Sequence, residues 1–319
     1  MSVDRRHFLL AGSTLAGGGL ASTAYAATAT GPARSILDFG VVPNPEKDQT
    51  EALQKAIDEL SRAGQPIVLP GGEYRATKLI LPNWCSVIGV PGQTLLNVGE
   101  VTTRPGNDTL GLFVLFGLSF QSKSSAVQIV APGGSPVRIA NCHFNGGGKT
   151  ALQLDGCSGT LETSYFQHYS ADAIAAMRSN LTISGCHFSD CGRGISSSSS
   201  RSAIVAQNQF DRCGTAVAAD GTALISGNIV KEAKEFGLKL GRGDGNGRVV
   251  AQGNLLENCR VGIGVTASGD DVFASLNLIH GAKDGAIRAF DGEKLVGRDL
   301  ARESAEMYLN LTVAGNVAR

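Results

Sequence analysis

The strongest constraint in this sequence is a repeat with a period of roughly 22 residues, which runs from residue 137 to residue 290. Each unit opens with a short apolar strand, turns at a small or polar corner residue, and continues to a second strand with a central aliphatic residue. The units are residues 137–156, 159–178, 181–200, 203–220, 222–241, 248–267 and 272–290. A fixed period of this length indicates a stacked repeat architecture.

Two independent columns of residues share this period. The corner positions recur once in each unit, at Cys142, Ser164, Cys186, Asn208, Asn228, Asn254 and Asn277. The second-strand aliphatic positions recur in the same way, at Leu152, Ile174, Ile195, Val217, Leu238, Ile263 and Ile287. Because both columns keep nearly the same spacing, equivalent residues are expected to stack on one another.

A unit this short predicts an all-β fold, a right-handed parallel β-helix. It leaves no room for the helices of ankyrin or tetratricopeptide units, and a leucine-rich repeat would need several Leu at fixed spacing, which these units lack. In a β-helix, equivalent positions stack about 4.8 Å apart. Inward aliphatic side chains then form continuous ladders. Asn at the corner can hydrogen-bond to its equivalents and tolerates left-handed backbone angles.

Residues 1–26 have the features of an export signal. Arg5 and Arg6 precede a weakly apolar, Gly-rich stretch, residues 8–24, and residues 24–26 read Ala-Tyr-Ala, a cleavage pattern. This segment resembles a twin-arginine signal peptide, which implies folding before export and work in the periplasm or beyond. The alternatives are an ordinary secretory signal or an uncleaved anchor. Residues 27–319 then form a single domain.

The composition excludes several classes of partner. Lys and Arg number 28, and Asp and Glu also number 28. This balance leaves no basic footprint for nucleic acid or an anionic membrane. Outside the signal, no apolar run approaches the ~20 residues of a membrane span. The seven Cys include no metal-binding pair, and we interpret most of them as small buried hydrophobic residues. A Cys191–Cys213 disulfide is the alternative to two free thiols.

The region before the repeat, residues 35–75, is predicted to cap the solenoid. Residues 38–40 read DFG, residues 48–58 read DQTEALQKAID with helical apolar spacing, and residues 66–74 read PIVLPGGEY. These runs resemble the opening of pectate-lyase-like β-helix proteins, and the resemblance implies a pectin-lyase-like solenoid with a helix over its open end. Such a cap is physically required, because an uncovered coil exposes strand edges. The chain as a whole resembles twin-arginine-exported repetitive β-helix proteins.

The remaining segments are less regular. Residues 97–108 are predicted to form a loop, and residues 118–120 to form an earlier corner. Residues 291–319 read as an irregular insertion and a partial last coil. Within them, residues 295–307 suit a short helix or a surface loop. No polar C-terminal cap is visible, so we expect either a partner or second copy to cover that end, or a sequence that is cut short.

The candidate catalytic residues are selected by their positions in the repeat, because no known catalytic motif identifies them. The polygalacturonase-like and epimerase motifs are missing, apart from an Asp-Asp echo at residues 269–271. Lys239 and Arg288 occupy outward positions on the second strand, and Asp220 lies two residues beyond such a position. A lyase of this fold needs a Lys or Arg base and groups that bind a uronate carboxylate. The alternative is ordinary solvated surface charge.

Two insertions lengthen coils near these residues. Residues 241–247 read GRGDGNG, and residues 268–271 extend the next coil. Loops that project from a rigid scaffold often carry sites. The Asp and Asn oxygens suit Ca²⁺, but the further Asp and terminal Glu of an EF-hand loop are missing, so a flexible turn is the alternative. No other cofactor is indicated.

The sequence therefore predicts an exported periplasmic repeat protein that interacts with polysaccharide. The specific hypothesis is a uronate-polysaccharide lyase or epimerase that uses Lys239, Arg288 and Asp220. The alternative is a non-catalytic carbohydrate-binding or cell-envelope structural protein, because outward positions are mostly filled by Ala, Ser and Gly. Fold alone does not decide between them.

Overall fold

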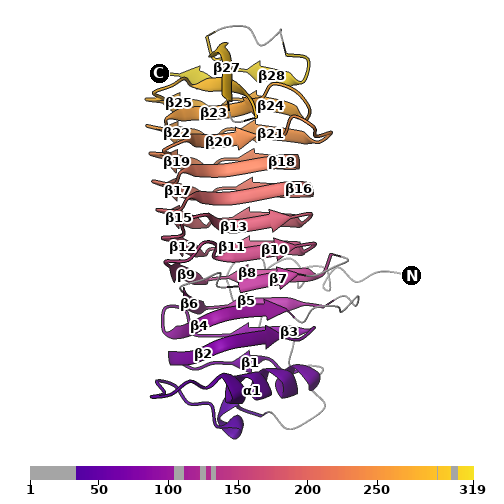
Figure 1. The fold of residues 1–319 in the computed structure, drawn as a ribbon, viewed down its shortest axis with the longest axis vertical. Coiled ribbons are helices and arrows are strands. Elements are labelled where there is room, and N and C mark those ends of the chain that lie inside the picture. Colours follow the sequence, from indigo (N-terminus) through magenta and orange to yellow (C-terminus); the bar gives the residue numbers. More distant parts are fainter. Residues whose placement is uncertain (1–33, 104–110, 123–126, 131–133, 293, 303–307) are drawn as a thin grey trace, which may run out of the picture.

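The protein is a right-handed parallel β-helix closed at one end by a helix, as predicted (Figure 1). The computed structural model describes residues 34–103, 111–122, 127–130, 134–292, 294–302 and 308–319. The predicted signal peptide, residues 1–26, lies outside the described residues. No helix in the described part is long and apolar enough to cross a membrane.

The elements follow one another along the chain in a regular order. Their bounds are η1 (Ile36–Phe39), α1 (Thr50–Arg62), β1 (Ile67–Val68), β2 (Gly72–Leu81), β3 (Cys85–Ile88), β4 (Thr94–Thr103), β5 (Phe113–Phe116), β6 (Leu118–Ser122), β7 (Val127–Val130), β8 (Pro136–Ala140), β9 (His143–Gly146), β10 (Leu152–Asp155), β11 (Ser158–Glu162), β12 (Tyr165–Gln167), β13 (Asp172–Met177), β14 (Asn180–Ser184), β15 (His187–Ser189), β16 (Arg193–Ala206), β17 (Gln209–Asp211), β18 (Thr215–Ser226), β19 (Ile229–Lys231), β20 (Phe236–Leu240), β21 (Arg248–Gln252), β22 (Leu255–Glu257), β23 (Val261–Thr266), β24 (Asp271–Ser275), β25 (Leu278–His280), β26 (Ile287–Asp291), β27 (Lys294–Asp299), β28 (Leu311–Ala314) and β29 (Val317–Ala318).

The strands form three parallel faces that run the length of the solenoid. The first sheet contains β8, β11, β14, β21 and β24, the second contains β9, β12, β15, β17 and β19, and the third contains β10, β13, β20, β23 and β26. The long strands β16 and β18 pass from the third sheet into the first. The register follows the sequence columns, because Ile174 pairs with both Leu152 and Ile195.

The interior is filled by stacked side chains. Five parallel Phe rings lie one above another with centroids 4.7–5.0 Å apart: Phe120, Phe144, Phe166, Phe188 and Phe210. The predicted aliphatic column is also fully buried. The ring spacing matches the strand spacing, so packing and backbone pairing reinforce each other.

The corner column forms the predicted polar ladder. Asn208, Asn228, Asn254 and Asn277 are buried, and the side-chain oxygen of each accepts the backbone N–H of the preceding corner residue at 2.9–3.0 Å. The expectation that these Asn residues adopt left-handed angles was wrong. The residue before each corner has the positive φ instead: Gln207, Gly227, Gly253 and Leu276. The bend at this residue directs the side chain of the following Asn into the interior.

The seven cysteines are all free and buried, as expected for small hydrophobic residues. Cys191 and Cys213 follow this pattern and are not bonded to each other. Burial raises the pKa of the Cys142 thiol to about 12, and it does the same for Cys85. Because the thiolate is the reactive form, these two side chains are chemically inert at neutral pH.

Helix α1 covers the open end of the first coil. Its apolar side chains Leu53, Ala56 and Ile57 are buried against the interior. The Gln54 side chain accepts from the backbone N–H of Ile80 and donates to its carbonyl, both at 2.8 Å. The Gln54 amide thus makes the two hydrogen bonds to Ile80 that a neighbouring strand would otherwise make, at the open edge of β2.

Two sequence expectations outside the repeat need correction. The predicted loop at residues 97–108 is a strand as far as Thr103, because β4 continues across two faces; residues 104–108 lie outside the described part. In the segment 295–307, predicted as a helix or loop, β27 forms an antiparallel hairpin with β26. Beyond it, β28 and β29 pair with β24 and β25.

Candidate functional site

The outer face of the third sheet holds Lys239 and Arg288 in one column. The register runs from Ala218 to Lys239, then to Gly264 and Arg288. Lys239 and Arg288 are therefore two coils apart on the same face, as the sequence predicted. Asp220 lies two residues beyond Ala218, which places it on the same face near the end of the third-sheet portion of β18.

Lys239 is held over aromatic rings. Its Nζ lies 5.1 Å from the ring centroid of Phe290 and 5.6 Å from that of Phe236. Gly264 makes this arrangement possible, because a Cβ there would lie 2.7 Å from the Phe236 ring. The faces of these rings attract the Lys239 ammonium group through a cation–π interaction.

The Arg288 guanidinium is hydrogen-bonded to backbone carbonyls in the turn before β26 and within β27. Its Nη1 donates to the carbonyl of Asp284 at 2.7 Å, and its Nη2 donates to the carbonyl of Gly297 at 3.0 Å. Its Nε is buried without a hydrogen-bond partner in the described part of the chain. The guanidinium therefore fixes the hairpin, a contact that the sequence period did not indicate.

Asp220 lines a groove at the turn between the third and first sheets. Its carboxylate accepts hydrogen bonds from the backbone N–H of Ser199 and the hydroxyl of Ser198. The groove encloses about 410 Å³. It is lined by Ser199, Ser200, Arg201, Asp220, Gly221, Thr222, Arg242, Gly245, Asn246, Gly247 and Asp270.

Two arginines that the sequence analysis did not select face this groove. Arg201 is exposed and forms no ion pair with any residue that the structure describes. Arg242 forms an ion pair at 2.6 Å with Asp244, whose side chain is 81% exposed. Such a solvent-exposed pair is weak, so both guanidinium groups remain accessible to an anionic ligand.

Asp270 forms part of the groove wall and binds the backbone of the Gly-rich loop, residues 241–247. It is fully buried, and its carboxylate accepts the backbone N–H groups of Gly247 at 2.7 Å, Arg242 at 3.0 Å and Gly221 at 3.2 Å. The glycines of residues 241–247 allow this close approach: a Cβ on Gly245 would lie 1.9 Å from Asp270 Oδ1. Among the described residues, no group of three or more His, Cys, Asp or Glu side chains is placed to hold a metal ion.

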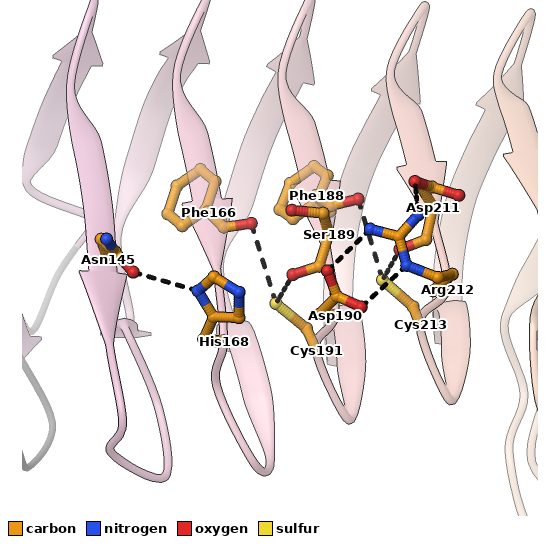
Figure 2. A network of polar contacts seen from close by, with 10 residues as sticks. All are labelled: Asn145, Phe166, His168, Phe188, Ser189, Asp190, Cys191, Asp211, Arg212 and Cys213. Carbon is orange, nitrogen blue, oxygen red and sulfur yellow. Dashed lines mark hydrogen bonds and ion pairs between the residues drawn. The ribbon is translucent and has the colours of Figure 1, made fainter.

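A separate polar network lies at the turns that follow the second sheet (Figure 2). His168 Nδ1 is 3.1 Å from Asn145 Oδ1, and the Arg212 guanidinium donates to both oxygens of Asp190 at 2.8–2.9 Å. Hydrogen bonding to Arg212 lowers the pKa of Asp190. The ion pair thus stabilises the fold above the ordinary carboxyl pKa, and its contribution is lost as pH falls through the lowered value.

Comparison with known families supports the β-helix superfamily. Residues 125–279 match the family described as a right handed beta helix region. Residues 33–97 match the rhamnogalacturonase A/epimerase, pectate lyase-like family, in agreement with the resemblance of the capping region. No protein with a curated description matches this sequence.

Solved structures with similar folds are distant in sequence. The pre-mature gene product 12 of bacteriophage phi29 has a TM-score of 0.58 at 14% identity, covering 82% of this chain and 47% of the phage protein. A tailspike mutant of E. coli bacteriophage HK620, solved with a pentasaccharide, has a TM-score of 0.50 at 15% identity, covering 80% of this chain and 59% of the tailspike. The chain thus spans about half of these proteins, and the likeness concerns the fold alone.

Proposed function

We propose that this protein binds an acidic polysaccharide in the groove beside Asp220. The observation that carries the proposal is the grouping of Arg201, Arg242 and Asp220 around one open groove on a rigid solenoid. Function resides in such a site rather than in the fold. The HK620 tailspike, which has the same architecture, was solved with a pentasaccharide, so the architecture is compatible with an oligosaccharide ligand.

The chemistry of the groove fits a uronate-containing chain. A guanidinium matches a carboxylate with two parallel hydrogen bonds, and Arg201 has no competing partner in the described part. Ser199, Thr222 and Asn246 add short polar side chains suited to sugar hydroxyls. Asp220 is pre-positioned by its own hydrogen bonds, which reduces the entropy lost on binding.

We propose recognition without turnover as the main function. A lyase or epimerase would use Lys239 as the base that takes the proton α to the uronate carboxyl, with Arg288 and Asp220 beside it. Lys239 packs over the rings of Phe236 and Phe290 and is not among the residues that line the groove beside Asp220. Arg288 is occupied by backbone carbonyls. Catalysis therefore remains the competing hypothesis, and Ca²⁺ dependence would belong to it.

The test is affinity electrophoresis in gels that contain polygalacturonate, alginate or neutral dextran. We expect the acidic polymers to retard the full chain, and Arg201→Ala to weaken that binding about tenfold, since charged hydrogen bonds contribute about 1.5–3 kcal/mol. Arg138→Ala is the matched control, because Arg138 is exposed on the first sheet outside the groove. Equal effects of the two variants would contradict the groove assignment. Release of unsaturated uronate ends, with or without added Ca²⁺, would instead establish a lyase.

Export through the twin-arginine pathway is part of this proposal. It rests on Arg5 and Arg6 and on the Ala-Tyr-Ala pattern at residues 24–26. Changing both arginines to lysine is expected to retain the full-length precursor in the cytoplasm of a bacterial host, while the unchanged chain appears shortened in the periplasmic fraction. A shortened periplasmic product from the double variant would refute this route.

A further inference from the structure

The outer face of the second sheet carries a row of three aromatic side chains on adjacent coils. Tyr165 on β12 pairs in register with His143 on β9 and His187 on β15. Their ring centroids are 6.1 Å apart for His143 and Tyr165, and 6.0 Å apart for Tyr165 and His187. Tyr165 is 52% exposed, so one large ring stands in solvent between two half-buried imidazoles.

The backbone beneath this row is rigidly supported. Each residue of the row precedes an interior phenylalanine, and Phe144, Phe166 and Phe188 stack in parallel with centroids 4.8 and 5.0 Å apart. The buried stack fixes the strands and therefore the spacing of the outer rings. A ligand that matches this spacing would bind without reorganising the protein.

Unpaired amide donors flank the exposed ring. Gln167 lies two residues after Tyr165 on the same face, and its Oε1 is 3.4 Å from His143 Nε2. Asn145, in register with Gln167, contacts His168 through its Oδ1. The amide nitrogens of Gln167 and Asn145 have no partner in the described part of the chain. They are free to donate to hydroxyl groups of a ligand.

The row is also free of strong charge. The three strands read HFNG, YFQ and HFS, without Lys, Arg, Asp or Glu. In the nearby turn the Arg212 guanidinium pairs with the carboxylates of both Asp190 and Asp211 (Figure 2). An aromatic face with amide donors and no fixed charge suits a neutral pyranose, whose C–H face stacks on the ring while its hydroxyls accept hydrogen bonds.

We propose that Tyr165, with His143 and His187, forms a second binding surface, the aromatic row, which takes a neutral hexose polymer. It lies on a different sheet from the Asp220 groove and does not depend on it. The in-register coils repeat about every 4.8 Å along the axis. A sugar chain that runs along this axis would contact the three rings in turn.

The test uses the full chain in gels that contain hydroxyethylcellulose, galactomannan or dextran. We expect at least one of these neutral polymers to retard the protein, and Tyr165→Ala to weaken that binding about tenfold, whereas Tyr165→Phe keeps it within about twofold. Gln209→Ala is the matched control, because Gln209 continues the same outward column one coil beyond His187. Urea unfolding of each variant separates loss of the surface from loss of the fold.

Several outcomes would overturn the proposal. One is that no neutral polymer retards the unchanged protein. Another is that Tyr165→Ala and Gln209→Ala are retarded equally. A third is an oligomer in size-exclusion chromatography that Tyr165→Ala converts to a monomer, which would make the row a protein contact. Arg201→Ala should leave neutral-polymer binding unchanged, so this surface and the acidic groove can fail independently.

Discussion

Replacing Asn254 with alanine is expected to lower the free energy of unfolding by about 3–5 kcal/mol, because buried groups would lose their partners. The Asn254 oxygen accepts from the backbone N–H of Asn228 at 3.0 Å and from its side-chain amide at 2.9 Å. Its own amide donates to the carbonyl of Ile225 at 3.0 Å and to Asn277 Oδ1 at 2.9 Å. Alanine would remove all of these hydrogen bonds from a buried site.

Urea denaturation measures this loss, and two variants calibrate it. Asn180→Ala, on an exposed position of β14, should change the midpoint little. Asn254→Ser should fall between them, because Ser164 shows that a corner hydroxyl can accept one backbone N–H, that of Cys142 at 3.1 Å. If Asn254→Ala and Asn180→Ala unfold at the same urea concentration, the ladder does not stabilise the fold.

The fold could be predicted because stacking makes a structural property visible as a sequence period. The corner and aliphatic columns needed no knowledge of distant contacts, since each residue packs on its equivalent one coil away. The period does not show which of two neighbouring residues has a given backbone conformation, because both residues recur with the same spacing. For this reason the left-handed angle was assigned to Asn208 and its equivalents, one residue after its true place at Gln207.

Segments that depart from the regular pattern of three short strands per coil were less predictable. Strands β2 and β4 continue from the second sheet into the third, and no corner residue marks the change. Strand β27 pairs only with its sequence neighbour β26, in the antiparallel sense, among the strands that the structure describes. No repeated column records such a contact, so the segment read as a helix or loop.

The positions of the candidate residues could be predicted from the period, but their contacts could not. Register alone placed Lys239 and Arg288 in one column, whereas Arg288 takes a partner from a segment that register does not constrain, the Gly297 carbonyl. No sequence pattern indicated Arg201, because its groove arises from the loop insertion at residues 241–247, two coils further along the solenoid. The aromatic row is visible in the sequence, because Tyr165 lies one period from both His143 and His187.

Replacing Phe166 with alanine is expected to destabilise the protein by about 3–5 kcal/mol, the usual effect of removing a buried aromatic ring. Phe166 is fully buried, and its ring stacks at 4.8 Å on Phe144 and at 5.0 Å on Phe188. The strand spacing holds those two rings apart, so they cannot close the cavity. Urea unfolding should report the loss.

The adjacent residue provides the control for this change. Tyr165 has a ring of similar size on the same strand but faces solvent, so Tyr165→Ala should change the unfolding free energy by less than about 1 kcal/mol. Because coils contact mainly their neighbours, hydrogen exchange in Phe166→Ala should accelerate most in β9, β12 and β15. Uniform acceleration would mean that the solenoid unfolds as one cooperative unit. Equal destabilisation by both variants would mean that the interior ring stack is not what holds these coils together.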